Sequence, residues 1–401
     1  MRLFYFVTDE YPAWRVDLAE LFSLELKRLG LQTDWSVRRE NTGLWSSVKK
    51  NGEIYYLPLA INAVPFISPI VRRLGELLGE MWLMAKLVFG QHYEFIQVRD
   101  DRYTAALFAY LAARIRGSYF TYWLSYPFPE NDLEKAQLAT GIRQVIFRVR
   151  GELARWWLYQ IVLPRADHVF VQTEHMKANM VAYGLDAKKM SAVPMGVSTR
   201  LFKWVATSKA IIEPNSLVYL GSFARSRRLE LILEALAIVV GKIPSVKLYM
   251  VGRGDVPADR VFLETLTKQL NLTQHIEYTG FVPIEQAWKI AANAAVCISP
   301  IYPTFIFNQA SPTKLYEYLA LGRPVVANEH PDQSVTLMES GAGISVQWDA
   351  HSFAQAIIYL LSHSEEAEAM ARLGPQWVED NRRYDYIAKT VFKQYKKMIE
   401  S

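Results

Sequence analysis

The sequence predicts an α/β protein with two Rossmann-like domains, and three observations carry that prediction. The chain has 401 residues, more than one compact core usually organises. Its residues are 51% hydrophobic and 21% charged, a composition that can fill large cores. Short apolar segments of strand length alternate with amphipathic segments of helix length. Such alternation is typical of parallel sheets, and the strands are too many for one doubly wound sheet.

The predicted elements follow each other regularly along the chain. In the first half we expect strands at 3–8, 54–58, 94–98, 119–124 and 168–172, and helices at 17–29 and 103–114. In the second half we expect strands at 217–220, 247–251, 275–278, 296–299, 324–327 and 344–346, and helices from near Leu229, Ala258, Ile284, Pro312 and Ala350. A turn at 195–196 before a polar segment marks the boundary. The expected domains are 1–200 and 201–380, followed by a final basic helix within 381–401.

The charge is unevenly placed. Residues 1–200 hold 25 Lys and Arg against 20 Asp and Glu, which accounts for the whole net charge of +5. These basic residues accompany apolar stretches rather than polar runs, so an anionic membrane surface or a phosphorylated acceptor is favoured over nucleic acid. The single cysteine, Cys297, excludes a disulfide framework and a Cys-based zinc cluster, and fits a reducing compartment. The apolar run at 1–7 is too short for a signal peptide, and no long uncharged apolar stretch follows, so we expect a cytoplasmic protein.

Two stretches interrupt the alternation. Residues 61–90 mix charges with apolar side chains and are expected to form a core-packing helix. Residues 141–163 carry Arg143, Arg148, Arg150 and Arg155 beside Trp156 and Trp157. That pattern fits a core helix with a solvated basic face, or a helix that lies in the plane of a membrane. The sequence leaves both interpretations open for this second stretch.

The densest motif lies at 310–327. Ser311 is a suitable N-cap and Pro312 a suitable first helical residue. The free N–H groups of Thr313 and Lys314 would then form an anion site, to which the Lys314 side chain adds a charge. Glu317 lies one turn further on, where a carboxylate can accept both hydroxyl groups of a ribose. An ordinary capped helix that leads into a strand would show the same pattern.

With this motif, the second half resembles the retaining glycosyltransferases of family 4. The resemblance is carried by segments in the family's order and spacing: 169–177, 193–197, 219–223, 250–254, 278–282 and 317–326. It implies the GT-B fold, in which two Rossmann-like domains face each other across a cleft and the last helix crosses back to the first domain. It also implies a hexosyltransferase that moves a sugar, with retention, from a nucleotide-diphosphate sugar to a glycan or lipid-linked acceptor. Such enzymes need no metal and no cofactor, and many synthesise surface polysaccharides or glycoconjugates.

The resemblance also implies which residues form the donor site. Gln309 stands where the family has the first of two glutamates, Glu317 is the second, and Arg228 stands at the position of a phosphate-binding lysine. Together with Lys314 these are the expected catalytic residues. The other expected donor contacts are Gly221, Ser222, Arg225, Gly252, Arg253, Gly254, Phe281, Val282, Ser311, Pro312 and Thr313. Ser222 occupies the position of a family arginine, for which Arg225 or Arg227 would substitute.

The first domain would bind the acceptor. Arg99 and Asp100 end one predicted strand, and Trp123, Ser125 and Tyr126 end the next, at the sheet edge where ligands bind. Trp123 and Tyr126 also fit a core role. Arg15 is a further expected contact, in the loop at 11–15 that replaces the family's glycine pair. No histidine occurs at 119–130, where the family often has one that contacts the donor sugar.

Two other functions remain open. A nucleotide-sugar epimerase of the same fold would need a set of acid and base side chains that we do not find. A non-catalytic subunit with the GT-B fold is kept open by Gln309, which lacks the charge of the family's glutamate. His175 and His330 are expected to be surface residues or residues with satisfied hydrogen bonds.

Overall fold

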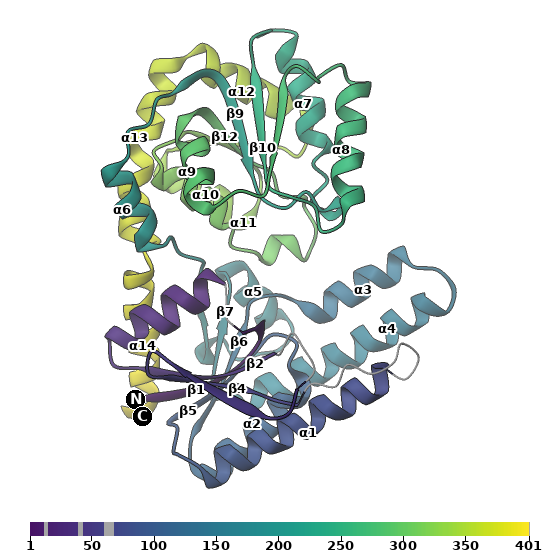
Figure 1. Ribbon diagram of the computed structural model, residues 1–401, viewed down its shortest axis with the longest axis vertical. Coiled ribbons are helices and arrows are strands. Elements are labelled where there is room, and N and C mark those ends of the chain that lie inside the picture. Colours follow the sequence, from purple (N-terminus) through teal and green to yellow (C-terminus); the bar gives the residue numbers. More distant parts are fainter. Residues whose placement is uncertain (12–14, 39–42, 60–67, 401) are drawn as a thin grey trace. The chain divides into compact units, whose positions relative to one another are not determined.

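The chain forms two compact units in the computed structural model (Figure 1). The structure describes residues 1–11, 15–38, 43–59 and 68–400, and only the backbone of residues 68–72. Unit 1 comprises Met1–Pro194 and Tyr384–Ser401, and unit 2 comprises Met195–Arg383. The boundaries between the units thus lie after Pro194 and after Arg383, whereas the sequence prediction placed them after residues 200 and 380. Part of the predicted acceptor loop, 12–14, and part of the first interrupting stretch, 61–67, lie outside the described residues.

Unit 1 is built on an eight-stranded sheet in the order β3-β4-β2-β1-β5-β6-β7-β8. Its strands are β1 (Arg2–Glu10), β2 (Gln32–Arg38), β3 (Ser46–Lys50), β4 (Glu53–Leu57), β5 (Phe95–Arg99), β6 (Tyr119–Leu124), β7 (His168–Val171) and β8 (Met190–Ala192). All neighbouring strands are parallel except β3, which is antiparallel to β4. The sequence did not predict β2, β3 or β8. The chain order reverses between β1 and β5, which makes this the switch point of the sheet.

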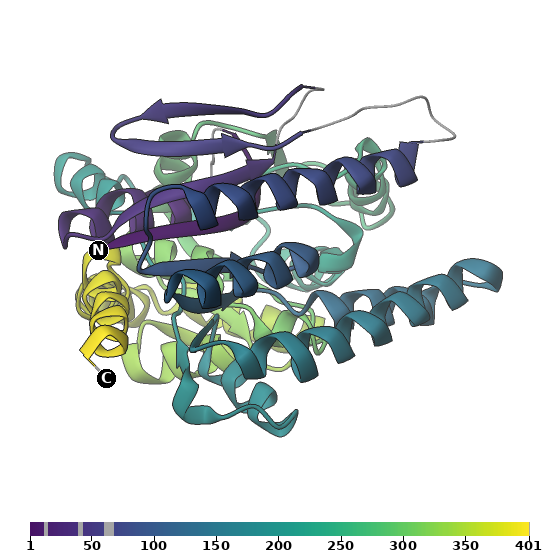
Figure 2. The ribbon, with the colours of Figure 1, turned by 90° about the horizontal axis from the view of Figure 1, so that it is seen from below.

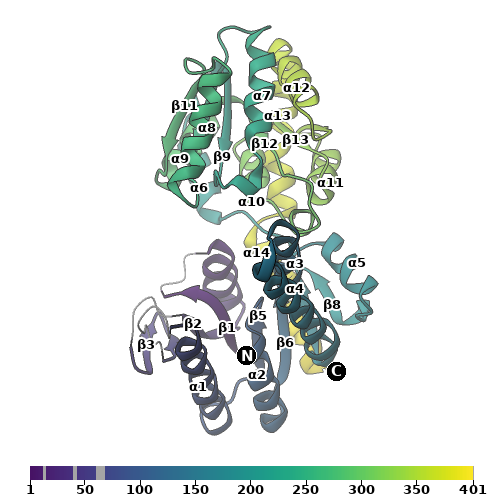
Figure 3. The same cartoon turned by 90° about the vertical axis from the view of Figure 1, so that its right-hand side faces the viewer.

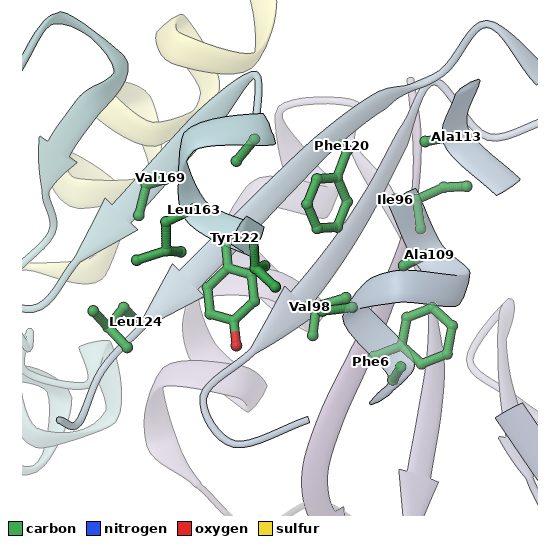
Figure 4. Close-up of a cluster of buried hydrophobic side chains, with 14 of the residues drawn as sticks. Phe6, Ile96, Val98, Ala109, Ala113, Phe120, Tyr122, Leu124, Leu163 and Val169 are labelled. Atoms are coloured by element: carbon green, nitrogen blue, oxygen red, sulfur yellow. The ribbon is translucent and has the colours of Figure 1, made fainter. Parts of the chain in front are cut away.

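Helices cover both faces of this sheet. They are η1, a π-helix (Asp17–Leu26), α1 (Ser68–Phe89), α2 (Tyr103–Arg116), α3 (Phe128–Leu138), α4 (Gly141–Trp156), η2 (Trp157–Val162), α5 (Glu174–Ala182) and α14 (Tyr384–Glu400). Alternate residues of β1 supply the two cores. Phe4 and Phe6 pack toward α1 and α2, while Leu3 and Tyr5 pack toward η1 and α14. Figure 4 shows the first of these cores, with Phe6, Val98 and Tyr122 among its side chains.

The last helix belongs to unit 1 although it follows unit 2 in the sequence. The hydroxyl group of Tyr395 on α14 donates a hydrogen bond to Gln97 on β5, with a distance of 2.6 Å. Its ring also lies edge-on to that of Phe95, with 4.7 Å between ring centres. Ile387 and Val391 are buried in the same core.

Helices α1, α2 and α4 lie side by side on one face of unit 1 (Figures 2 and 3). The first interrupting stretch of the sequence becomes α1, which buries Leu83 and Leu87. The core interpretation of this stretch was incomplete, because α1 also leaves Leu74, Leu78 and Met81 exposed. Among the residues that the structure describes, no helix has both the length and the apolar character to cross a membrane.

Unit 2 contains a six-stranded, all-parallel sheet in the order β11-β10-β9-β12-β13-β14. Its strands are β9 (Glu213–Leu220), β10 (Lys247–Val251), β11 (Ile276–Gly280), β12 (Ala294–Ser299), β13 (Val325–Asn328) and β14 (Gly343–Val346). Its helices are α6 (Thr199–Thr207), α7 (Glu230–Val240), α8 (Pro257–Gln269), α9 (Ile284–Asn293), α10 (Thr313–Ala320), α11 (Pro331–Ser340), α12 (Ala350–Ser362) and α13 (Ser364–Asn381). The strand order is that of a doubly wound Rossmann fold with its switch point between β9 and β12. The predicted α/β class with two Rossmann-like domains is confirmed.

Candidate functional site

Two glycines bring the ends of β9 and β10 together at the carboxyl edge of the unit 2 sheet. Gly221 and Gly252 have φ angles of 146° and 142°, which side chains other than hydrogen rarely tolerate. A Cβ atom on Gly252 would lie 1.9 Å from the carbonyl oxygen of Gly221. The Gly221 N–H donates to the carbonyl of Val251 at 2.9 Å. The sequence therefore requires glycine at both positions, because protein atoms fill the space that a side chain would need.

A short basic turn, η5 (Arg225–Arg227), follows Gly221. Arg225 lies over the ring of Phe262 at 3.2 Å, Arg227 over Phe307 at 4.8 Å, and Arg228 over Tyr302 at 5.5 Å. The predicted phosphate contact, Arg228, is exposed and paired with Glu230 at 3.1 Å.

Arg227 differs from Arg228 in its surroundings. Within the described part of the chain it forms no ion pair, and its charge acts on Lys314. The cation that the structure brings to Lys314 is thus Arg227. The predicted Ser222 lies beside this turn, where its hydroxyl group accepts the Ala224 N–H at 3.1 Å.

Lys314 is held at this edge from the first turn of α10. Its Nζ lies 4.0 Å from the centre of the Tyr219 ring, and a Cβ on Gly221 would lie 3.0 Å from it. Burial lowers the pKa of Lys314 well below its usual value, and the charge of Arg227 lowers it further. An anion bound here would relieve both effects.

Glu317 lies one turn further along α10. Burial raises its pKa to about 7, while the neighbouring Trp288 indole and the Lys314 ammonium group act in the opposite direction. Trp288, on α9, was missed by the sequence prediction because it belongs to no motif and fits the apolar face of that helix. The site therefore contains a carboxyl group that changes its charge near neutral pH.

The start of α10 differs from the prediction. The N-cap is Pro312 rather than Ser311, the helix begins at Thr313, and no side chain caps it. The Ser311 hydroxyl group instead accepts the Met195 N–H at 3.1 Å and donates to Asp332 at 2.9 Å. The Ser311 hydroxyl group does not cap α10, because it is hydrogen-bonded to Asp332, which lies far away in the sequence. Among the described residues no side chain caps the helix, and its first N–H groups have no partner within the helix.

Two buried polar side chains support the loop before α10. The amide of Gln309 donates to the carbonyl of Phe305 at 3.0 Å. His330 caps α11 by accepting the N–H groups of Asp332 and Gln333, and its Nε2 lies 2.9 Å from the carbonyl of Phe307. The expectation that His330 has satisfied hydrogen bonds is confirmed.

A second loop follows β10 at the same edge. Arg253 lies over the ring of Phe281 at 5.2 Å, and Phe281, which follows β11, is 75% exposed. Val282 is half-buried beside it. A Cβ on Gly254 would lie 2.5 Å from the Asp259 side chain, so this turn also requires glycine. These residues form an exposed aromatic and basic wall.

Unit 1 places a buried charge cluster at the switch point of its own sheet. The Arg99 side chain has no exposed surface and donates to Asp17 at 2.6 Å, to Asp100 at 3.1 Å and to Ser125 at 3.1 Å. Asp100, with a φ of 52°, accepts both the N–H and the hydroxyl group of Ser125 at 2.7 Å. Three predicted acceptor contacts, Arg99, Asp100 and Ser125, are thus brought together.

Two carboxylates of this cluster were missed. Asp17, the first residue of η1, also accepts from Arg15 at 3.2 Å. Burial acts to raise the pKa of Asp17, but Arg99 and Arg15 outweigh it and the pKa is lowered. Burial raises the pKa of Asp9, near the end of β1, against the effect of Arg15 and Arg99. The available signal was a pair of carboxylates that flank the end of the first strand.

Two further predicted acceptor contacts, Trp123 and Tyr126, have different environments. Trp123 is 2% exposed and packs against Phe22 and Phe170, both at 5.2 Å, so it takes the core role that the sequence also allowed for it. Trp123 lies at the end of a central strand, and its ring packs in the hydrophobic core. Tyr126 is partly exposed, and its hydroxyl group donates to Asn131 at 3.3 Å. Within the described ranges, no three His, Cys, Asp or Glu side chains gather so as to hold a metal ion.

Comparisons with known proteins agree with this architecture. Residues 24–201 match the sequence model of Glycosyltransferase Family 4, and residues 214–363 match that of Glycosyl transferases group 1. The amylovoran biosynthesis glycosyltransferase AmsK of Erwinia amylovora is 24% identical over 188 residues, which are 46% of this chain and 45% of that relative. The match therefore spans less than half of either protein.

Solved structures match over the full length. Sucrose-phosphate synthase from Thermosynechococcus elongatus has a TM-score of 0.76 at 18% identity, over 100% of this chain and 99% of that one. HepE from Anabaena, in complex with UDP-glucose, has a TM-score of 0.67 at 15% identity, over 99% and 100%. The chain belongs to the group 1 and family 4 glycosyltransferases and has the GT-B fold.

Proposed function

We propose that the protein transfers a hexosyl group from a nucleoside-diphosphate sugar to a glycan or lipid-linked acceptor, with retention of configuration. The synthesis of a surface polysaccharide or glycoconjugate is the process that fits, and the relative AmsK is a glycosyltransferase of amylovoran biosynthesis. One observation carries the proposal. Lys314 and Arg227 lie together at the carboxyl edge of the unit 2 sheet, and neither forms an ion pair among the described residues. A bound diphosphate would add to the negative charge that Glu317 already supplies to Lys314.

The site has a group for each part of such a donor. Negative charge builds on the diphosphate as the sugar leaves, and Lys314, Arg227 and the N–H groups at the start of α10 would stabilise it. Glu317 would accept the ribose hydroxyl groups, and the wall of Arg253 and Phe281 would hold the base. In this proposal the cations take the place of a metal ion, and no cofactor takes part. The complex of HepE with UDP-glucose supports a nucleotide sugar as the donor class.

Replacing the lysine tests the donor site. Charge-assisted contacts to phosphate contribute about 1.5–3 kcal/mol each, so Lys314→Ala should weaken the binding of UDP, or of whichever nucleoside diphosphate the wild type binds best, about tenfold or more. Calorimetric titration measures this. Lys268→Ala, on the exposed face of α8, is the matched control and should bind as the wild type does. Unchanged affinity in Lys314→Ala would remove the proposed diphosphate site.

Product analysis after turnover distinguishes glycosyl transfer from the two alternative functions. Incubation with a set of nucleotide sugars and candidate acceptors should give transfer products with the donor's anomeric configuration. Formation of an epimer would instead identify a nucleotide-sugar epimerase. Binding without turnover would identify a non-catalytic subunit, the alternative that the uncharged and buried Gln309 keeps open.

We also propose that the protein works at the cytoplasmic face of a membrane and that α4 binds that surface. Ile142, Val145, Val149 and Trp156 recur at helical spacing on α4, and each is more than half exposed. Two of the four arginines are neutralised, because Arg150 pairs with Asp132 and Arg155 pairs with Glu152. Arg143 and Arg148 form no ion pair among the described residues and would contribute about 1 kcal/mol each near an anionic surface.

Liposome flotation tests the membrane proposal. The wild type should float with anionic vesicles at low salt and less at high salt, because salt screens the arginines. A double variant, Arg143→Gln with Arg148→Gln, should lose the salt-dependent part. Absence of the wild type from both anionic and neutral vesicles would refute membrane binding and would leave the donor site unaffected.

A further inference from the structure

We propose that Asp332 is a positioning residue that ties the start of α10 to the two points at which the chain enters and leaves unit 2. A ligand bound at the start of α10 would then hold both of these connecting segments in place. The inference rests on the donor site proposed above and deepens it, because it gives the bound nucleotide a second effect. All the residues that carry it belong to unit 2.

The carboxylate of Asp332, in the first turn of α11, accepts hydrogen bonds from two hydroxyl groups. Ser311, which lies just before α10, donates to it at 2.9 Å. Tyr316, within α10, donates to the same oxygen, and the two hydroxyl oxygens lie 3.1 Å apart. Ser311 is 7% exposed and Tyr316 is fully buried, so water has little access to these contacts. Asp332 therefore holds the loop before α10 and the helix itself in one arrangement.

The segment that enters unit 2 is held by the Ser311 hydroxyl group. The single proton of this group is donated to Asp332, so a lone pair of its oxygen is available to another donor. The N–H group of Met195, the first residue of unit 2, donates to that oxygen at 3.1 Å. The carboxylate thus sets the direction of the Ser311 hydroxyl group and, through it, the position of the entering chain.

The segment that leaves unit 2 is held by Arg382, which follows α13. Its guanidinium group lies 3.7 Å from the Asp332 carboxylate and over the rings of Tyr316 and Trp377, at 4.9 Å and 5.1 Å. The carbonyl group of Arg382 accepts the Val197 N–H at 2.7 Å, so the two connecting segments are also bonded to each other. We call Ser311, Tyr316, Asp332 and Arg382 the Asp332 cluster. It links the start of α10 to both connections.

Close packing between α10 and α13 makes this link stiff. Gly374 of α13 lies against α10, where a Cβ atom would come within 2.7 Å of the carbonyl oxygen of Leu319. Protein interiors packed this tightly transmit a displacement instead of absorbing it. We therefore expect a change at the start of α10 to reach the end of α13, and with it Arg382.

The proposed donor acts on the same loop. In the donor complex, the N–H groups of Thr313 and Lys314 would bind the diphosphate, and both residues closely follow Ser311. A ligand that fixes this loop stabilises the arrangement in which Ser311 accepts the Met195 N–H. Such a coupling is reciprocal: the factor by which UDP stabilises the intact cluster is also the factor by which breaking the cluster weakens UDP binding.

Hydrogen exchange and calorimetry measure this factor from its two sides. In the full-length wild type, UDP, or whichever nucleoside diphosphate binds best, should slow exchange of the Met195 and Val197 amides about fivefold, as mass spectrometry of peptides from this segment detects. Asp332→Ala should bind the same nucleotide about fivefold more weakly. In that variant the two amides should exchange faster, and the nucleotide should no longer slow them.

A purely structural role of Asp332 predicts a different result. Exchange in Asp332→Ala would then be faster with and without nucleotide, but the nucleotide would still slow it by the wild-type factor. Asp349→Ala is the matched control, because the Asp349 carboxylate accepts the Ser352 N–H at 2.8 Å at the start of another helix of unit 2, α12. This control should keep both the nucleotide affinity and the nucleotide-dependent slowing.

A second variant covers a failure to fold. Should Asp332→Ala not fold in a thermal melt, Tyr316→Phe removes one hydroxyl group from the cluster and should show the same two changes. Its matched control is Tyr249→Phe, which loses a hydrogen bond of 2.7 Å to the Glu213 carboxylate.

Failure of this inference is distinguishable from failure of glycosyl transfer. Slowing of the two amides that is lost in Asp332→Ala supports the inference even where no sugar is transferred. Absence of slowing in the wild type, or slowing that persists in Asp332→Ala, would overturn it even where the protein transfers sugar.

Discussion

The two sheets differ in whether the charged side chains at their carboxyl edges form ion pairs. In unit 1, the guanidinium group of Arg99 is fully buried and hydrogen-bonded to both Asp17 and Asp100. In unit 2, Arg227 and Lys314 share one site, and neither forms an ion pair with any residue that the structure describes. Unit 1 neutralises its buried guanidinium group with ion pairs, whereas in unit 2 the carboxyl group of Glu317 compensates Lys314 only in part.

The difference indicates where a charged ligand belongs. A buried charge without a counter-charge is expensive, so a folded protein keeps one only where something else supplies the partner. The network around Arg99 fixes the ends of β1, β5 and β6 and offers a rigid polar wall. Arg227 and Lys314 are partly buried and form no ion pair among the described residues, and the carboxyl group of Glu317 compensates Lys314 only in part, so the pair is suited to receive an anion. Three variants break or sharpen this comparison.

The largest expected effect is in unit 1. Asp17→Ala removes one partner of the buried Arg99 and should lower the free energy of unfolding by about 3–5 kcal/mol. Urea unfolding measures the loss, and Glu174→Ala, at an exposed position of unit 1, should change stability by about 0.5 kcal/mol or less. UDP binding by the folded variant should remain that of the wild type. A stable Asp17→Ala protein would show that the network is not what holds this edge.

The next effect separates two neighbouring arginines of unit 2. Arg227→Ala should weaken UDP binding about tenfold or more, as expected for the loss of a charge-assisted phosphate contact. Arg228→Ala should weaken it less than about threefold, because the exposed Arg228 is already paired with Glu230. Titration of both variants gives the ranking. The opposite order would restore Arg228 to the role that the sequence predicted for it.

The smallest effect concerns pH. The pKa of Glu317 is raised to about 7, so in the free protein its ionisation costs stability, and unit 2 should become less stable as pH rises through 7. Ribose binding favours the ionised form, so UDP affinity should rise by up to about tenfold from pH 6 to pH 8. Glu317→Gln removes the part of the pH dependence of UDP affinity that comes from Glu317. The phosphate and Lys314 titrate in both proteins, so their contribution is the same in the two pH profiles. Parallel pH profiles for the two proteins would show that Glu317 does not take part.

Much of unit 2 could be predicted from the sequence because its strands are runs of apolar residues and its site lies on local motifs. Gly221, Gly252, Lys314 and Glu317 are each recognisable within a few residues of chain. What failed there depends on distant partners. Ser311 has the residue type and position of an N-cap, but Asp332 and the Met195 N–H engage its hydroxyl group.

Backbone conformation decided the choice between the arginines. Arg228 adopts a left-handed conformation with a φ of 53°, at the residue that ends the η5 turn. Local sequence does not require this conformation of an arginine, since glycine and asparagine are the usual residues in it. Family spacing therefore pointed to Arg228, whereas the folded turn brings Arg227 to Lys314.

Unit 1 was harder to predict because it buries polar residues. Strand β2 was missed since Thr33, Asp34 and Ser36 lie in it, and all three are buried. Asp34 is satisfied by Arg2 at 2.9 Å and by the Ile54 N–H at 2.8 Å. These partners lie far away in the sequence, so no local pattern distinguishes such a strand from a loop.

The path of the chain has a consequence for biosynthesis. Residues 195–383 form unit 2, and only afterwards does the chain add α14 to the core of unit 1. Until Tyr395 has left the ribosome, the sheet face that carries Phe95 and Gln97 lacks its cover. The unit made first is therefore the last to be completed, and its apolar face stays open to chaperones while unit 2 folds. A chain truncated after Arg383 and released from the ribosome should show a folded unit 2 beside a protease-sensitive unit 1.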